Sequence, residues 1–359
     1  MKAMPLDFSK ENKSIPLQII VKIPTSCDTY VSFIGSQLPT SVRDPVTSRV
    51  LVLTYLRSGS TLTGDILQQS PKSFYLYEPL KKDKSQIFFN DYACLTSTKN
   101  CSQYNTSKIL EIFSDLFNCH LKGHEQRVLG KSTGKQSLAV TRAIPDCKAS
   151  RSYDICIKKI QKICHESNSI ILKTIRVSMD LVRSLLIKFK DIHIVHLLRD
   201  PRGIMSSRRR GGFLRKTDIG VSAKWLCEVF RSNIYHSKAL QSQFPNRITT
   251  VLYEDIAENP FTVSNELYRN LNLEYSETFD EWLFNHTSAG NTSYSYYGTV
   301  RSNSKETSQS WRTKLKFHDV KVIENVCKDV IERLGFRNVV DENDLRNIDN
   351  SLRIRSFNL

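Results

Sequence analysis

Residues 50–61 read VLVLTYLRSGST, and this segment is the most informative about the fold. A continuous apolar run such as residues 50–56 is typical of a strand buried on both faces of a parallel sheet. A loop of small residues follows, and after it Leu62, Ile66 and Leu67 recur on one helical face. The stretch therefore predicts a buried strand, a tight loop and a helix.

The same alternation of strand and helix continues along the chain. Apolar runs predict strands at 169–172, 192–198 and 248–253. Apolar residues at helical spacing predict helices at 181–189 with Ser178 as N-cap, at 222–240, and at 320–334 before Gly335. The pattern predicts an α/β domain of three layers around a central parallel sheet, with ligands at the carboxyl ends of the strands.

We expect this domain to occupy residues 46–340. Residues 1–45 have scattered prolines and no sustained period, which predicts a poorly ordered lead-in, and residues 341–359 form a C-terminal tail. Residues 81–165 have weak periodicity and predict a variable insertion of short helices and loops. No window approaches the roughly 18 apolar residues that span a bilayer, and the first twenty or so residues lack a signal-peptide pattern.

The composition indicates a folded protein that binds anions. The chain has 359 residues, of which 40% are hydrophobic and 25% charged, and this mix excludes collagen-like and wholly disordered classes. Lysine and arginine number 52 against 36 acidic residues, which gives a net charge of +16. Nucleic acid, membrane phosphate, a polyanionic glycan and a phosphorylated co-substrate would all suit this excess, so charge alone does not choose among them.

Nine cysteines occur without a CxxC or another paired metal-ligand spacing, so we expect disulfides and no metal site. The odd number leaves at least one thiol, and the connectivity stays open. Sequons of the form N-x-S/T add to this pattern, and together the two features predict an oxidising lumen. The sequons begin at Asn12, Asn100, Asn105, Asn285 and Asn291.

The loop at 57–61 is the first predicted anion site. Successive backbone N–H groups in front of a helix N-terminus cradle a phosphate-sized anion, and Arg57 adds a permanent positive charge. The alternative is an ordinary turn between strand and helix. The loop lacks the spacing G-x-x-x-x-G-K-[ST], which disfavours a metal-dependent nucleotide hydrolase.

The second predicted anion site lies in residues 197–208, LLRDPRGIMSSR. Arg199 ends a buried strand, and Ser207 follows eight residues later in the expected helix, so the two side chains can converge on one phosphate. Alternatively, Arg199 forms a structural ion pair with Asp200, and Pro201 merely starts the helix.

Five motifs in order resemble the Golgi carbohydrate sulfotransferases, and more narrowly the branch that sulfates the 6-hydroxyl of galactose, N-acetylgalactosamine or N-acetylglucosamine. The similarity covers about residues 48–337. Its motifs are RSGST at 57–61 with LYEPL at 76–80, LKTIR at 172–176, LLRDPRGIMSSR at 197–208, LYED at 252–255 and WR at 311–312. Members of this family have a three-layer P-loop-like sulfotransferase fold.

The resemblance implies 3′-phosphoadenosine 5′-phosphosulfate (PAPS) as co-substrate, with no metal. Arg199 and Ser207 would hold the 3′-phosphate. The charge that builds on the departing nucleotide phosphate would be stabilised by Arg57 and by loop N–H groups. The residues implied for the 5′-phosphosulfate are Arg57, Ser58, Gly59, Ser60, Thr61 and Leu62.

A sugar hydroxyl needs a base to take its proton, and Glu78 is the candidate. It follows the apolar run 74–77 and precedes Pro79, so partial desolvation would raise its basicity. The alternative is that Glu78 only pairs with a nearby cation. His196 is the rival base, although its place in a core strand favours a structural role.

Three further groups of residues have both structural and functional interpretations. The arginines at 208–210, with Arg215 and Lys216, indicate a solvated charged face or a guide for an anionic glycan, and nothing there reads bases, so no nucleic acid partner is expected. We expect Glu254 and Asp255 to pair with the arginine-rich site. Trp311 is expected to pack and Arg312 to close a loop over the nucleotide, whereas RSNS at 301–304 departs from the family pattern.

These features predict a PAPS-dependent transferase that sulfates a sugar hydroxyl, the 6-hydroxyl by the resemblance, in a glycan or proteoglycan acceptor. The family is normally anchored in the Golgi membrane, so we expect a lumenal enzyme whose anchor lies upstream of this sequence, or a soluble secretory form. A P-loop nucleotide kinase is one alternative, but it needs a loop lysine and metal ligands. A non-catalytic, basic glycan-binding protein is the other.

Overall fold

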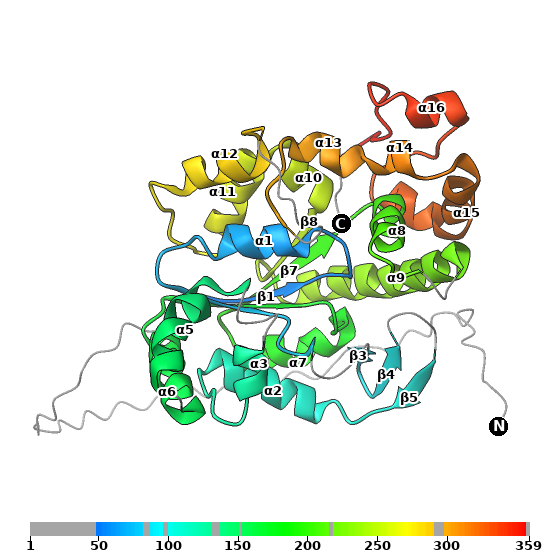
Figure 1. Ribbon diagram of the computed structural model, residues 1–359. Helices are drawn as coiled ribbons and strands as arrows, with labels where there is room; N and C mark the ends of the chain where they lie inside the picture. Colours follow the sequence, from blue (N-terminus) through cyan, green and yellow to red (C-terminus); the bar gives the residue numbers. More distant parts are fainter. Residues whose placement is uncertain are drawn as a thin grey trace, which may run out of the picture. The chain divides into compact units, whose positions relative to one another are not determined.

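The computed structural model describes residues 48–81, 86–95, 100–130, 136–150, 152–214, 218–290 and 298–356. A parallel sheet with strand order β2-β6-β1-β7-β8 lies at the centre of the folded unit (Figure 1). Its strands are β1 (Ser48–Leu53), β2 (Ser73–Tyr77), β6 (Ser169–Thr174), β7 (Ile192–Leu198) and β8 (Ile248–Leu252). The predicted α/β class and central parallel sheet are confirmed.

Both faces of the sheet are covered, because successive side chains of a strand point to opposite sides. In β1, Val50 and Val52 pack into one core, whereas Leu51 and Leu53 pack into another. The first core includes residues of α1 (Ser60–Leu67), α10 (Tyr253–Glu258), α11 (Pro260–Asn270) and α12 (Phe279–Thr287). The second includes α2 (Ser107–Phe117), α3 (Glu125–Leu129), α5 (Leu138–Ser150), α6 (Tyr153–His165) and α7 (Met179–Lys188), with Ser178 at the N-cap of α7 as predicted.

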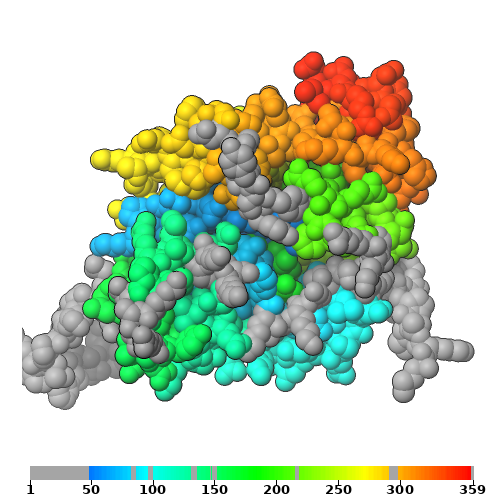
Figure 2. All heavy atoms as spheres, viewed as in Figure 1, coloured from blue at the N-terminus to red at the C-terminus, as the bar shows by residue number. Residues whose placement is uncertain are grey.

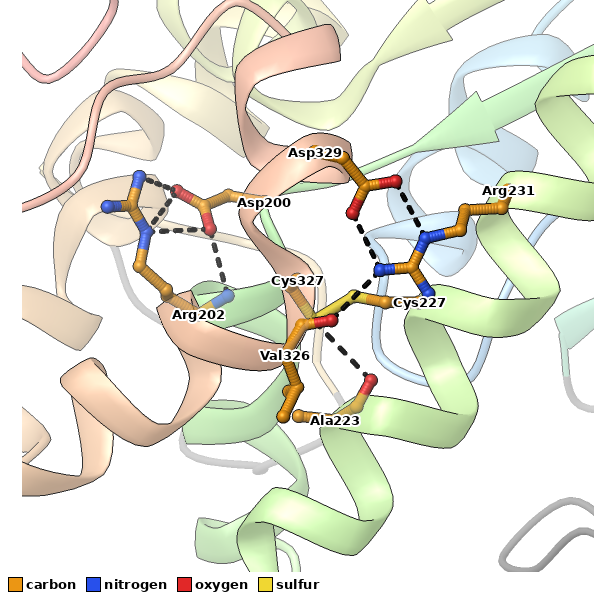
Figure 3. The surroundings of a disulfide bond; sticks show 8 residues. All are labelled: Asp200, Arg202, Ala223, Cys227, Arg231, Val326, Cys327 and Asp329. Carbon is orange, nitrogen blue, oxygen red and sulfur yellow. Dashed lines mark hydrogen bonds and ion pairs between the residues drawn. A yellow bond between two sulfur atoms is a disulfide. The ribbon is translucent and has the colours of Figure 1, made fainter.

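A third core gathers α8 (Pro201–Arg210), α9 (Ile219–Gln243) and α15 (Phe317–Arg333). Figure 3 shows how α9 and α15 are joined by the disulfide Cys227–Cys327. Close to it, Arg231 Nε donates to Asp329 Oδ2 at 2.7 Å, and its Nη2 donates to a backbone carbonyl of α15 at 2.9 Å. These two helices therefore form a stapled pair, with α13 (Ser304–Gln309) and α14 (Trp311–Lys314) preceding α15 in the chain.

The region expected to hold short helices and loops also contains a small antiparallel sheet. Its strands are β3 (Gln86–Phe89), β4 (Tyr92–Leu95) and β5 (Cys101–Gln103). Cys94 and Cys101 face each other across β4 and β5 and form a disulfide. Phe88 N donates to Arg176 O at 2.8 Å, so the sheet is attached just after the end of β6. Such short strands carry too few residues for a periodic signal.

The cysteines form disulfides, as the sequence predicted. Two further pairs are Cys119–Cys164 and Cys147–Cys156, which bring the described total to four. The ninth cysteine, Cys27, lies outside the described residues, as does the whole predicted lead-in at 1–45. Along the described part of the chain, no helix is long and apolar enough to cross a membrane.

The segment after residue 340 contains α16 (Glu342–Arg346) and is held by Arg312. The Arg312 side chain is 1% exposed, and it donates to the carbonyl oxygens of Leu345 at 3.1 Å, Asn350 at 2.9 Å and Asp344 at 2.6 Å. The expectation that Arg312 closes a loop over the nucleotide is therefore wrong. Its donors are engaged by the C-terminal segment instead.

Candidate active site

The carboxyl ends of all strands of the central sheet lead into one cavity of about 780 Å³, the edge at which the sequence predicted ligands. Residues just beyond the strand ends line it: Arg57 after β1, Glu78 after β2, Arg176 after β6, Arg199 after β7 and Tyr253 after β8. In Figure 2, residues of the α1 region (blue), of α8 and α9 (green) and of the 300–315 region (orange) come together on one face. A volume of this size suits a nucleotide-sized ligand.

The first predicted loop requires its glycine. Gly59 has φ of +89° and lies against the Tyr253 ring, so that a Cβ atom would come within 2.0 Å of a ring carbon. Arg57 also adopts a left-handed φ of 72°. Helix α1 starts directly afterwards, and Gly59, Ser60, Thr61 and Leu62 all line the cavity. The orphan N–H groups of the first helical turn are thereby placed beside the cavity.

Ser58 is the exception in this loop. Its side chain is fully buried and does not line the cavity. The hydroxyl donates to Tyr55 O at 2.7 Å, and the Ser58 backbone N–H donates to the same oxygen at 3.2 Å. These bonds tighten the turn after β1, so Ser58 shapes the loop and its side chain stays away from the cavity.

The two predicted anion motifs meet in space although about 150 residues separate them. Arg57 Nε donates to Ser207 Oγ at 3.0 Å, and Arg199 Nη1 donates to Arg57 O at 3.0 Å. All three residues line the cavity. Sequence reasoning predicted both sites but not their direct contact, because the parallel pairing of β1 with β7 creates it.

The alternative of an ion pair between Arg199 and Asp200 is wrong. Asp200 pairs with Arg202, whose Nη2 lies 2.8 Å from Oδ2, and it caps α8 by accepting from Arg202 N at 2.8 Å. Arg202 is fully buried and also contacts Glu324 at 2.9 Å. Arg202 therefore neutralises Asp200 and leaves Arg199 at the cavity.

Arg199 is instead held by Tyr253 and Glu254. Its guanidinium lies 4.3 Å from the centroid of the Tyr253 ring, and its Nε lies 3.8 Å from Glu254 Oε1. Burial raises the pKa of Glu254 to about 7, against the opposing influence of Arg199. The expected pairing of Glu254 with the arginine-rich site is confirmed, whereas Asp255 forms its ion pair with Arg353.

More cations gather at the cavity than the motifs predicted. Arg210, Arg301 and Lys314 line it together with Arg57 and Arg199. Burial, together with the positive charges of Arg57 and Arg199, lowers the pKa of Arg301. Burial and the charge of Arg210 lower the pKa of Lys314. Mutually repelling cations in one cavity favour a polyanionic ligand.

Residues 301–304, which depart from the family pattern, have different roles: one lines the cavity and two others make structural contacts. Arg301 lines the cavity, whereas Asn303 caps α13 by accepting from Glu306 N at 3.1 Å. Ser304 Oγ donates to Ala257 O at 2.6 Å. The basic run at 208–210 is divided in the same way: Arg208 is buried, Arg209 pairs with Asp319 at 2.6 Å and residue 210 lines the cavity; Arg215 and Lys216 lie outside the described residues.

Glu78 lines the cavity in a buried ion-pair network. It is 3% exposed, has φ of 50°, and its Oε1 accepts a hydrogen bond from Lys173 Nζ. Oε2 lies 3.8 Å from Arg176 Nε and has no hydrogen-bond partner within the described residues. Lys173 was missed as a site residue, although a lysine inside the buried strand β6 is itself a signal, because buried charges need partners.

The rival base lies elsewhere. His196 is fully buried in β7, its Nε2 is 2.9 Å from the Tyr55 hydroxyl, and burial lowers its pKa to about 3. It does not line the cavity. Trp311 packs in the third core, as expected, with the Arg202 guanidinium 4.6 Å from its ring centroid. Among the described residues His196 therefore has structural contacts only, whereas Trp311 packs in the third core and also lines the cavity. Glu78 remains the carboxylate at the strand ends.

Comparison with known proteins agrees with the motifs. Carbohydrate sulfotransferase 1 of Rattus norvegicus is 26% identical over 339 residues, which cover 84% of this chain and 82% of that protein. Carbohydrate sulfotransferase 5 of Mus musculus is 25% identical over 83% of both chains. Among solved structures, the sulfotransferase domain of the Synechococcus PCC 7002 olefin synthase has a TM-score of 0.40 at 16% identity, covering 81% of this chain and 98% of that one.

The resemblance to carbohydrate sulfotransferases drawn from the motifs is confirmed by the two carbohydrate sulfotransferases and by the family match. The sulfotransferase domain family matches residues 47–335, a range that includes both anion loops, Glu78 and the whole central sheet. The chain therefore belongs to the sulfotransferase domain family.

Proposed function

We propose that this chain transfers the sulfuryl group of PAPS to a sugar hydroxyl, specifically the 6-hydroxyl of galactose, N-acetylgalactosamine or N-acetylglucosamine in a glycan or proteoglycan. The observation that carries the proposal is the contact of Arg57 with Ser207 and Arg199 beside the N-terminus of α1, across one cavity from Glu78. The names of the relatives support a carbohydrate acceptor.

The nucleotide loops have separate roles in this proposal. Residues 59–62 and Arg57 hold the 5′-phosphosulfate through N–H groups and a guanidinium, while Arg199 and Ser207 hold the 3′-phosphate. The bond between sulfur and the bridging oxygen breaks, and that oxygen leaves with its electron pair on adenosine 3′,5′-bisphosphate. Arg57 stabilises the charge that develops there.

Glu78 serves as the general base. The acceptor oxygen forms the new bond to sulfur, and its proton passes to Glu78 Oε2, the carboxylate oxygen that lacks a hydrogen-bond partner within the described residues. Lys173 fixes the other oxygen, Oε1, and so orients the carboxylate. Proton, sulfuryl group and leaving group are thus each matched to residues that line the same cavity.

We place this reaction in the Golgi lumen. The four disulfides of the described residues support an oxidising compartment. The sequon asparagines Asn100, Asn105 and Asn285 are exposed, so they are available for glycosylation, while those at 12 and 291 lie outside the described residues.

The test is transfer of radioactive sulfur from labelled PAPS to chondroitin, keratan and N-acetylglucosamine-terminated acceptors. We expect label on at least one acceptor without added metal, and disaccharide analysis should place it on a 6-hydroxyl. Label on another hydroxyl would refute the 6-position alone. Binding of acceptors with no transfer would favour the non-catalytic glycan-binding protein, and phosphoryl transfer from labelled ATP would favour the kinase.

A further inference from the structure

A second, small cavity adjoins the active-site cavity. Leu56 and Ile175 line both, and each directly precedes a site residue, Arg57 or Arg176. The volume is about 20 Å³, enough for one small polar group. The other lining residues are Tyr55, Ile87, Arg208, Trp225, Leu226 and Val229.

Arg208 brings a buried positive charge to this small cavity. The residue is 8% exposed, and its Nε donates to Leu56 O at 3.2 Å. In the described part of the chain no carboxylate lies within ion-pair distance of it, whereas Arg202 on the same helix has two. Burial lowers the pKa of Arg208 to about 10, in keeping with a cation that lacks an anionic partner.

Trp225 adds a second hydrogen-bond donor. It is 8% exposed, and its indole Nε1 is buried without a hydrogen-bond partner among the described residues. An indole N–H only donates, as does a guanidinium. Aspartate and glutamate are absent from the described lining, which is otherwise mostly apolar. The described lining of the small cavity therefore includes two donor residues and no acidic one, and the ligand group that matches them is an anionic acceptor of hydrogen bonds.

We propose that this cavity binds a carboxylate of the acceptor, carried by an acidic sugar next to the one that receives the sulfuryl group. The proposal rests on the sulfotransferase function proposed above and names its acceptor class. A planar carboxylate accepts two parallel hydrogen bonds from a guanidinium and fits a small space better than a tetrahedral sulfate does. Because Leu56 and Ile175 line both cavities, a carboxylate bound in the small one lies beside the active-site cavity.

The test compares a chondroitin oligosaccharide, which carries uronic acid carboxylates, with its uronic acid methyl ester. We expect wild-type kcat/KM to be about 10- to 100-fold higher for the free acid, the usual effect of hydrogen bonds to a charged group. Arg208→Gln should abolish this preference and leave the Kd of adenosine 3′,5′-bisphosphate unchanged. Trp225→Phe should reduce the preference by less, and it serves as the second variant if Arg208→Gln does not fold.

Arg231→Gln is the matched control, because it also removes one arginine charge, from an exposed ion pair on α9. It should keep the wild-type preference for the acid. Three outcomes would overturn the subsite while the proposed function stands. They are equal wild-type kcat/KM for acid and ester, transfer to neutral acceptors alone, and preference for a sulfated neutral acceptor. The subsite would also be overturned if Arg208→Gln lowered kcat/KM for the acid, kcat/KM for the ester and the affinity for adenosine 3′,5′-bisphosphate by the same factor. Absence of transfer to every acceptor would instead refute the proposed function.

Discussion

Replacing Glu78 with glutamine perturbs a buried ion pair and the proposed base together. Glu78 is 3% exposed and Lys173, which donates to its Oε1, is 2% exposed. Loss of the carboxylate charge leaves the ammonium without its partner, which costs about 3–5 kcal/mol of unfolding free energy. If Oε2 takes the acceptor proton, the rate constant for sulfuryl transfer also falls about 10²- to 10⁴-fold.

A second change, Lys173→Met, separates these two effects. The Glu78→Gln/Lys173→Met protein no longer buries an unpaired charge, so most of the lost unfolding free energy should return. The transfer rate should stay low, because no carboxylate is restored. Denaturant unfolding measures the first quantity, and single-turnover transfer at saturating PAPS measures the second.

Glu324→Gln is the matched control for this experiment. Glu324 is 2% exposed and pairs with Arg202 and Lys321 away from the cavity lining. Glu324→Gln should lower the unfolding free energy, but it should not lower the rate constant for sulfuryl transfer as much as Glu78→Gln does. A stable Glu78→Gln protein, single or double, that transfers within tenfold of wild type would refute the role of Glu78 as base.

Four further variants test other parts of the structure. Arg57→Ala and Arg199→Ala should each weaken binding of adenosine 3′,5′-bisphosphate by about 1.5–3 kcal/mol in calorimetry, and unchanged affinity in both would refute the phosphate assignments. Burial raises the pKa of Glu254 from 4.5 to about 7. Between these two pH values the folded protein holds a proton that the unfolded chain has lost, so the folded state is stabilised at low pH. About 3 kcal/mol of unfolding free energy is therefore lost as pH rises from about 4.5 to above 7. Glu254→Gln should remove this part of the pH dependence of denaturant unfolding, and a curve parallel to that of wild type would contradict the shift. Cys227→Ala with Cys327→Ala opens a link between residues 100 apart and should cost about 2–5 kcal/mol, whereas free thiols at both positions in secreted wild type would contradict the pairing.

The sequence was most informative about features that depend on a single strand and the loop that follows it. Residues 50–56 and 192–198 predicted buried strands because every residue is apolar or lies in an apolar run, and both strands are buried. Residues of the loops after them line the cavity, as expected of ligand-binding loops at the strand ends. The contact of Arg57 with Ser207 could not be predicted, since it depends on β7 pairing next to β1. Likewise, Lys173 meets Glu78 because β6 pairs with β2 in register, with Tyr77 opposite Lys173.

Charged residues were the least predictable part of the site. A run of three arginines at 208–210 usually indicates a solvated face. Helix α8, however, packs into the third core on one side and lines the cavity on another, so Arg208 is buried while residue 210 lines the cavity. Arg312 was expected to close a loop over the nucleotide, but its side chain is bonded to the backbone of the C-terminal segment. The period of apolar residues predicts which face of a helix is apolar. It does not predict the partners of a buried cation, because these come from distant segments of the chain.

Recognition of the 3′-phosphate separates a PAPS site from a general basic cavity. This recognition can be measured without knowledge of the acceptor. Folded wild-type protein is titrated calorimetrically with adenosine 3′,5′-bisphosphate and with adenosine 5′-phosphate, both in the presence of a metal chelator. Because Arg199 and Ser207 are assigned to the 3′-phosphate, the bisphosphate should bind about 10- to 100-fold more tightly, at one site per chain. Equal affinity for the two nucleotides, or no binding of either without metal, would contradict the assignment of this cavity to PAPS.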